Sequence, residues 1–153
     1  MPNPVVILAT VAAIAAAAVG GLFYAFSTFV MRGLDRTGPD AAATAMRGIN
    51  AEAQANAPFL VLFMGSALVA LVVGIAALRQ IGLPGSGWLL AGGAVLALVP
   101  LVVTVAVNVP LNDRLAASLP WQEYHRIWTL WNHVRTAAPL IGSAAMLIGV
   151  RLR

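Results

Sequence analysis

The sequence predicts an all-α fold, a bundle of four transmembrane helices with a short extra helix between the first and second spans. Hydrophobic residues make up 61% of the 153 residues and charged residues only 9%, whereas a soluble domain carries about 25% charged residues. The mean hydropathy is +0.90, and the apolar residues gather in four long runs. Such a chain cannot cover its surface with polar groups in water. A soluble domain, a disordered chain and a nucleic-acid-binding module are therefore excluded.

The first span is predicted over residues 5–31. A helix of this length measures about 40 Å, which exceeds the ~30 Å hydrocarbon core and crosses it with tilt. No basic residue precedes it, and the apolar run is too long for a signal peptide, so we expect it to be retained. Small residues follow a four-residue step at Ala13, Ala17, Gly21 and Ala25. This pattern predicts a close approach by another helix.

The second and third spans are predicted over residues 58–79 and 88–109, in one domain with the others. Pro58 suits the first turn of a helix, where its missing N–H costs nothing. The connection over residues 82–87 is rich in helix breakers and predicts a tight turn. The third span contains Pro100, which predicts a kink, and we expect it to end at Val109-Pro110.

Two polar connections, residues 32–57 and 110–126, lie on the same side of the predicted membrane. The first is long enough for a helix, with Asp40 as its expected N-cap. All nine basic residues are Arg, the net charge is +4, and Arg residues are more frequent on the side of the connections. This bias predicts a multi-pass protein of the cell membrane with the polar connections in the cytoplasm.

The fourth span is predicted over residues 122–150. Only residues 136–150 are uncharged, and this run is too short for a span of about 20 residues. The helix must therefore begin earlier, which brings Asn132, His133 and Arg135 into or close to the membrane. The face of this helix that turns toward the bundle is predicted to carry Trp121, His125, Trp128, Asn132, Arg135 and Pro139, with Tyr124 and Trp131 at its margin.

Arg135 is the strongest candidate for a functional side chain, because charges inside spans usually face a cavity or a partner. The alternative is that its long stem reaches the headgroups. His133 lies about 100° from Asn132 around the helix. It could be a general base, a haem or metal ligand, or an interhelical contact. His125 lies nearer the interface and is a weaker candidate for the same roles.

Metal chemistry has few candidates in this sequence. There are no cysteines, which excludes disulfides, Fe–S clusters and Cys-ligated zinc. The two His residues are eight positions apart, which is not the i, i+4 spacing of a helical metal site. We therefore expect neither a metal site nor another cofactor, although haem binding by His125 or His133 stays open.

Four segments together resemble the DUF1772 or anthrone oxygenase-like family of membrane proteins. They are residues 21–31, 45–50, 109–115 and 128–136, in the order of that family's first helix, first connection, third helix and fourth helix. The resemblance implies a small four-helix membrane protein. Its characterised relatives oxidise anthrones to anthraquinones with O2 and are thought to need no metal or flavin.

The residues are compatible with such chemistry. In this hypothesis, His133 removes the acidic ring CH2 proton of an anthrone, and Arg135 with Asn132 stabilises the oxyanion. The predicted substrate-binding side chains are Tyr24, Asn50, Asn108, Asn112, Trp128 and Trp131. The expected partners are the lipid bilayer, an aromatic small molecule and O2, and the Ala- and Gly-rich surfaces allow a homo-oligomer. The alternative is a non-catalytic membrane protein, either a small-molecule binder or an accessory subunit.

Overall fold

The computed structural model describes residues 3–153, and within this range the protein is helical without strands. Four continuous helices are long and apolar enough to cross a membrane, which confirms the predicted fold class. They comprise α1 (Pro4–Ala25), η1 (Phe26–Val30) and α2 (Met31–Asp35); α4 (Ala57–Arg79); α5 (Ser86–Val103), η2 (Thr104–Asn108) and α6 (Val109–Ala116); and α7 (Trp121–Arg151). The extra helix is α3 (Pro39–Ala55), between the first and second spans.

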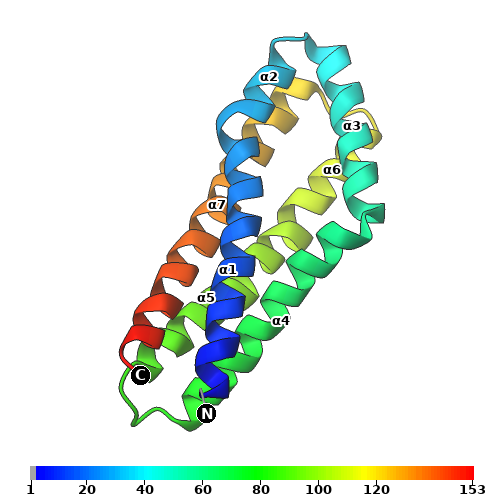
Figure 1. Cartoon of the computed structure of the whole chain (residues 1–153). Helices are drawn as coiled ribbons and strands as arrows, with labels where there is room; N and C mark the ends of the chain where they lie inside the picture. The colour runs from blue at the N-terminus through cyan, green and yellow to red at the C-terminus, as the bar shows by residue number, and fades with distance from the viewer. Residues whose placement is uncertain (1–2) are drawn as a thin grey trace.

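The four long helices form a ring in which α1 and α5 each pack against both α4 and α7. The start of α1, the end of α7 and the α4–α5 turn lie at one end of the bundle, here called the turn end (Figure 1). The segments α2, α3 and α6, with the start of α7, lie at the other end, here called the loop end (Figure 1). The polar connections therefore share one end of the bundle.

Local sequence determines where α3 and α4 begin. Gly38, at a φ of 90°, precedes Pro39, so Asp40 lies in the first turn of α3 and is not its N-cap as expected. Asn56 separates α3 from α4, and its side chain accepts a hydrogen bond from the Phe59 N–H at 2.9 Å. This cap lets α3 and α4 follow one another with a single non-helical residue between them.

The third span differs from the prediction, because Val109-Pro110 does not end it. The helix continues as α6 to Ala116, after the wider π-helical turn η2. Proline lacks an N–H, and its ring clashes with the carbonyl four residues earlier in a regular helix. A π-helical turn just before Pro110 accommodates this clash. A second π-helical turn, η1, lies in the first span.

Glycines let the helices pack closely toward the turn end. A Cβ atom on Gly92 would lie 2.8 Å from the carbonyl oxygen of Gly142, and one on Gly93 would lie 2.8 Å from the Cα of Gly74. Backbone therefore packs directly on backbone between α5 and both α7 and α4. Such close approach excludes a ligand from this end of the bundle.

The predicted small-residue stripe on the first span was wrong. Gly21 is exposed with open space around its Cα, while the buried face of α1 contains Ala9, Ala12, Ala13, Ala16 and Gly20. A strict four-residue step drifts about 40° around the helix at each repeat. Alternating steps of three and four residues keep the buried set on one side.

The loop end has an apolar core of its own. Met31, Met46, Leu115 and Tyr124 are fully buried there and belong to one cluster with Trp121 and Trp128. The Trp121 indole N–H donates to Asp35 Oδ1 at 2.7 Å. These contacts hold α2, α3 and α6 against the first turns of α7.

Candidate functional site

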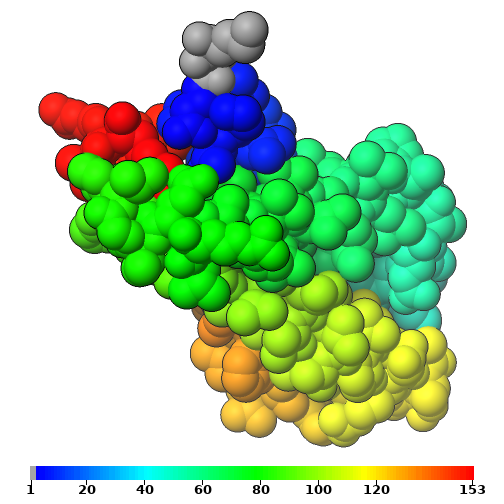
Figure 2. Space-filling view, turned by 90° about the horizontal axis from the view of Figure 1, so that it is seen from below, coloured from blue at the N-terminus to red at the C-terminus, as the bar shows by residue number. Residues whose placement is uncertain are grey.

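A cavity of about 730 Å³ lies at the loop end, between the four spans and α3. Its walls come from α1 and η1, α3, the start of α4, the α5–η2–α6 helix and α7. In the space-filling view from the turn end, α3 and α4 lie along one side of the molecule and α6 along the opposite side (Figure 2). The volume is within the range of small-molecule binding sites, about 300–1,000 Å³.

Aromatic rings form much of the cavity wall. Phe59 and Phe63 on α4 stack with ring centroids 5.8 Å apart, and Phe23 on α1 meets Phe63 edge-on at 6.0 Å. Across the cavity, Phe26 and Trp128 pack at 5.8 Å. All five side chains line the cavity. A wall of ring faces and edges is complementary to a flat aromatic ligand.

Arg135 is the cationic side chain of the cavity and is only 6% exposed. The carbon of its guanidinium lies 4.4 Å from the ring centroid of Phe23 and 4.9 Å from that of Trp128. Nη1 donates to Thr104 Oγ1 at 3.3 Å, and Nη2 donates to Asn132 Oδ1 at 2.8 Å. These are neutral acceptors and aromatic faces, so no contact of the guanidinium within residues 3–153 balances its charge.

No carboxylate among residues 3–153 forms an ion pair with Arg135. Within residues 3–153 the one ion pair joins Arg114 to Glu123 at 3.3 Å, on the surface. Glu52 on α3 lines the cavity without forming an ion pair there. Arg47, on the same helix as Glu52, donates to the Leu115 carbonyl oxygen. Glu52 is thus a free carboxylate at the cavity, on an exposed part of α3.

Asn132 lies behind Arg135 and accepts a hydrogen bond from its guanidinium. Its side chain is fully buried, and Nδ2 donates to the Phe23 carbonyl oxygen and to Ser27 Oγ, each at 2.8 Å. The Ser27 hydroxyl on η1 also forms a hydrogen bond with the Thr136 hydroxyl on α7 at 3.0 Å. Because its N–H groups are used by the first span, the amide oxygen of Asn132 is directed at the guanidinium.

A second network ties α3 to α6 and α7. Asn112 Oδ1 accepts hydrogen bonds from the Tyr124 hydroxyl at 2.9 Å and from the Trp128 indole N–H at 3.1 Å. Asn50 on α3 donates to the Tyr124 hydroxyl at 3.4 Å. These bonds keep α3 beside the cavity.

Asn108 links the two networks. With its amide oriented so that the oxygen faces the donors, Oδ1 accepts from Trp128 Nε1 at 3.2 Å and from Arg135 Nη2 at 3.3 Å. This orientation satisfies both partners, which is the usual basis for assigning an amide. Asn108 is 1% exposed and sits behind the cavity wall.

The structure thus gathers six of the nine predicted site residues at one place. Four line the cavity, and they are Asn50, Asn112, Trp128 and Arg135. Asn108 and Asn132 lie directly behind them and fix the guanidinium.

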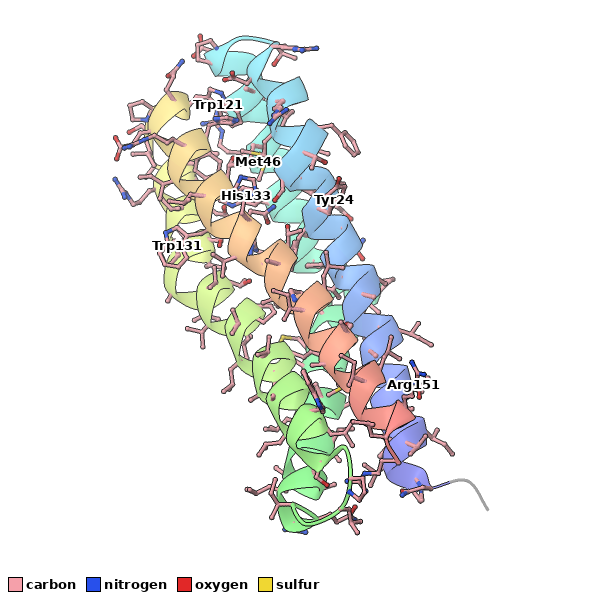
Figure 3. The ribbon with its side chains drawn as sticks, turned by 90° about the vertical axis from the view of Figure 1, so that its left-hand side faces the viewer. Tyr24, Met46, Trp121, Trp131, His133 and Arg151 are labelled. Atoms are coloured by element: carbon pink, nitrogen blue, oxygen red, sulfur yellow. The ribbon has the colours of Figure 1, made fainter. Side chains whose placement is uncertain are left out.

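The other three predicted residues lie outside the cavity. Tyr24 is 55% exposed, Trp131 is 38% exposed, and His133 is exposed on α7. Figure 3 shows Tyr24 and Trp131 on opposite sides of the bundle. The expected bundle-facing orientation of Trp131 is wrong. Trp131 and Gly149 are 18 residues apart, so they point in the same direction from the axis of α7. Gly149 is nevertheless buried against Leu89, because the helices converge at the turn end.

Neither His side chain reaches the cavity. The His125 ring packs 5.5 Å from Trp121, and its Nε2 is buried without a hydrogen-bond partner among residues 3–153. In that range no three His, Cys, Asp or Glu side chains are grouped so that they could hold a metal ion.

The phenylalanine wall was not anticipated from the sequence. Phe23 and Phe26 are three positions apart, and Phe59 and Phe63 are four apart. Such spacing places each pair on one helix face. The spacing was therefore a usable signal, although it did not indicate which face of each span turns inward.

A family comparison covers the greater part of this site. The family model described as anthrone oxygenase matches residues 56–145, which is more than half of the chain. The matched region runs from α4 into α7 and includes Asn108, Asn112, Trp128 and Arg135. No curated protein and no solved structure matches the chain. By the extent of this match, the chain belongs to the anthrone oxygenase family.

Proposed function

We propose that the protein oxidises the ring CH2 of an anthrone-like polycyclic aromatic to a ketone with O2, without a cofactor. The observation that carries this proposal is the buried guanidinium of Arg135, which faces a large aromatic cavity without a paired carboxylate. Membership of the anthrone oxygenase family supports the same reaction class.

Arg135 is the proposed oxyanion-stabilising residue. Loss of a ring CH2 proton leaves a carbanion whose charge resides largely on the carbonyl oxygen as a phenolate-like anion. A guanidinium has five N–H donors. Three have protein acceptors, on Thr104, Asn132 and Asn108. The remaining two are available to the developing oxyanion. A charge fixed in advance in a dry site stabilises it strongly.

Glu52 is the proposed proton acceptor. It is the one carboxylate among the side chains that line the cavity within residues 3–153. The sequence-based hypothesis gave this role to His133, but that side chain is exposed and does not line the cavity. A base must come within hydrogen-bond reach of the proton it removes, which favours Glu52.

The oxidation balances without a further redox partner. The carbanion adds to O2 with transfer of its electrons, which forms a C–O bond and, after protonation, a hydroperoxide. The O–O bond then breaks as the second ring proton leaves, and the products are the ketone and water. One anthrone and one O2 thus give one anthraquinone and one water.

The test is oxidation of anthrone by the purified protein in phosphatidylcholine vesicles. Quinone absorbance and O2 uptake should rise together, one O2 per quinone, faster than in protein-free vesicles. The Arg135→Gln variant should lose at least tenfold in rate, and Arg151→Gln, at the exposed far end of α7, should not. A rate equal to that of protein-free vesicles would refute the proposal.

The same cavity is compatible with a non-catalytic binding protein, the alternative function. The distinguishing result is saturable binding of anthrone without O2 uptake above the protein-free rate. This outcome would retain the cavity as a ligand site and remove the oxygenase assignment.

We also propose that the loop end faces the cytoplasm of the cell. Five Arg residues lie toward this end, namely Arg32, Arg36, Arg47, Arg114 and Arg126, against three at the turn end. Because the chain has no native cysteines, a single cysteine placed at Thr37 or at Leu83 can report the side of each loop. Impermeant maleimide should label only the cysteine at Leu83 in intact cells.

A further inference from the structure

The cavity contains the cation of Arg135 and the carboxylate of Glu52, and within residues 3–153 these two groups form no ion pair. Within residues 3–153, Arg135 forms no ion pair, and its hydrogen bonds go to the neutral side chains of Thr104, Asn132 and Asn108. Burial of a charge without a counter-charge is costly. A ligand with a negative charge would relieve this cost and gain affinity from it.

The surroundings of the guanidinium restrict where the ligand's charge can sit. The rings of Phe23 and Trp128 pack over the guanidinium carbon. A ligand can therefore bond only the two N–H groups at the guanidinium edge that have no acceptor among residues 3–153. These donors match an oxygen anion, a phenolate or a carboxylate, with hydrogen bonds in the guanidinium plane.

The lining of the cavity is exposed in two places: at polar residues of α3, which include Glu52 and Gln54, and at apolar side chains of the membrane-spanning segments. Leu22 on α1, Leu60 and Met64 on α4, and Val105 on η2 all line the cavity while being 37% to 62% exposed. These exposed side chains belong to helices apolar enough to span a membrane. The cavity therefore opens to the lateral surface of the bundle, where the surroundings are acyl chains.

We propose that the cavity binds lipophilic aromatic monoanions that enter from the bilayer, with the ionised oxygen at the N–H edge of Arg135 and the rings against Phe59, Phe63 and Trp128. The inference rests on the proposed function, because it names the substrate class of that site. These are aromatic compounds that bind with an ionised oxygen and from which Glu52 then removes the ring CH2 proton. Affinity for the anion does not depend on turnover.

A matched pair of probes tests the charge requirement. Anthracene-9-carboxylate and anthracene-9-methanol share one flat tricyclic ring, differ in charge, and have no ring CH2 to oxidise. Binding to the protein in phosphatidylcholine vesicles is followed by anthracene fluorescence, with protein-free vesicles correcting for partition into lipid. We expect the carboxylate to bind at least tenfold more tightly than the alcohol. Equal affinities in the native protein would overturn the proposal without any variant.

Variants then assign the preference to one side chain. Arg135→Gln should lower carboxylate affinity at least tenfold and change alcohol affinity by less than threefold, while Arg151→Gln should change neither. Retention of the full preference in Arg135→Gln would overturn the assignment. Vesicles with added phosphatidylglycerol control for lipid headgroups. Displacement of the carboxylate by this lipid would show that a headgroup supplies the anion, which overturns the proposal for aromatic anions.

The outcomes separate this inference from the oxygenase proposal. Selective carboxylate binding with no oxidation of anthrone would support the anion-binding site and refute the oxygenase proposal. Oxidation that depends on Arg135, with no preference between the two probes, would retain the reaction and reject ground-state anion recognition.

Discussion

Arg135 donates a hydrogen bond to the amide oxygen of Asn132, one turn earlier on α7, at 2.8 Å. Asn132 is itself held by the Phe23 carbonyl oxygen and Ser27 on the first span. The position of the cavity's cation therefore depends on the contact between α7 and the first span. A change at Asn132 should act through Arg135.

We predict that Asn132→Ala destabilises the protein by about 1–3 kcal/mol, because it removes the acceptor of a buried guanidinium N–H and the hydrogen bonds to the Phe23 carbonyl oxygen and Ser27. Thermal unfolding in detergent micelles measures the effect. His133→Ala, at the adjacent exposed position, is the matched control and should change stability by no more than about 0.5 kcal/mol. Similar losses in both variants would contradict the positioning role of Asn132.

We predict that Glu52→Gln lowers kcat for anthrone oxidation by roughly 10²-fold or more, which is the usual contribution of a general base. Gln preserves the shape of the side chain and removes its ability to accept the proton. His133→Ala should retain the native rate within about twofold, since His133 does not line the cavity. If quinone absorbance rose at the native rate in Glu52→Gln and much more slowly in His133→Ala, His133 and not Glu52 would be the general base.

We predict that Phe63→Leu raises KM roughly fivefold with little change in kcat, because loss of one ring contact costs about 1 kcal/mol of binding. Phe63 is stacked on Phe59 in the cavity wall. Phe29→Leu is the control, since Phe29 is 65% exposed and does not line the cavity. Steady-state kinetics separate the two parameters, and a fall in kcat alone would argue against a binding role.

We predict that Gly92→Ala destabilises the bundle by about 1–3 kcal/mol. The added Cβ would lie 2.8 Å from the Gly142 carbonyl oxygen, and this backbone atom cannot rotate away. Gly65→Ala on α4 is the control, because its Cβ would meet open space. Since Ala is favoured over Gly within helices, Gly65→Ala should leave the midpoint of thermal unfolding unchanged or raise it. Equal midpoints for Gly92→Ala and the native protein would show that α5 and α7 are not tightly packed there.

The number of long apolar helices and the position of Arg135 well inside the last of them follow from local sequence. The uncharged run over residues 136–150 is too short to cross a bilayer, which required α7 to begin well before Arg135. The structure agrees, because α7 begins at Trp121 and Arg135 is 6% exposed. Hydrophobic length and helical period are properties of one segment, and one sequence is enough to reveal them.

Which face of each helix turns inward, and which segments meet, depended on the tertiary structure. Trp131 and Gly149 share one direction on α7, yet only Gly149 is buried, because close packing of glycines draws the helices together at the turn end and not at the loop end. Glu52 joined the cavity because the short Asn56 connection and the Asn50–Tyr124 hydrogen bond place α3 there. These are contacts between segments distant in sequence, and helical periodicity carries no information about them.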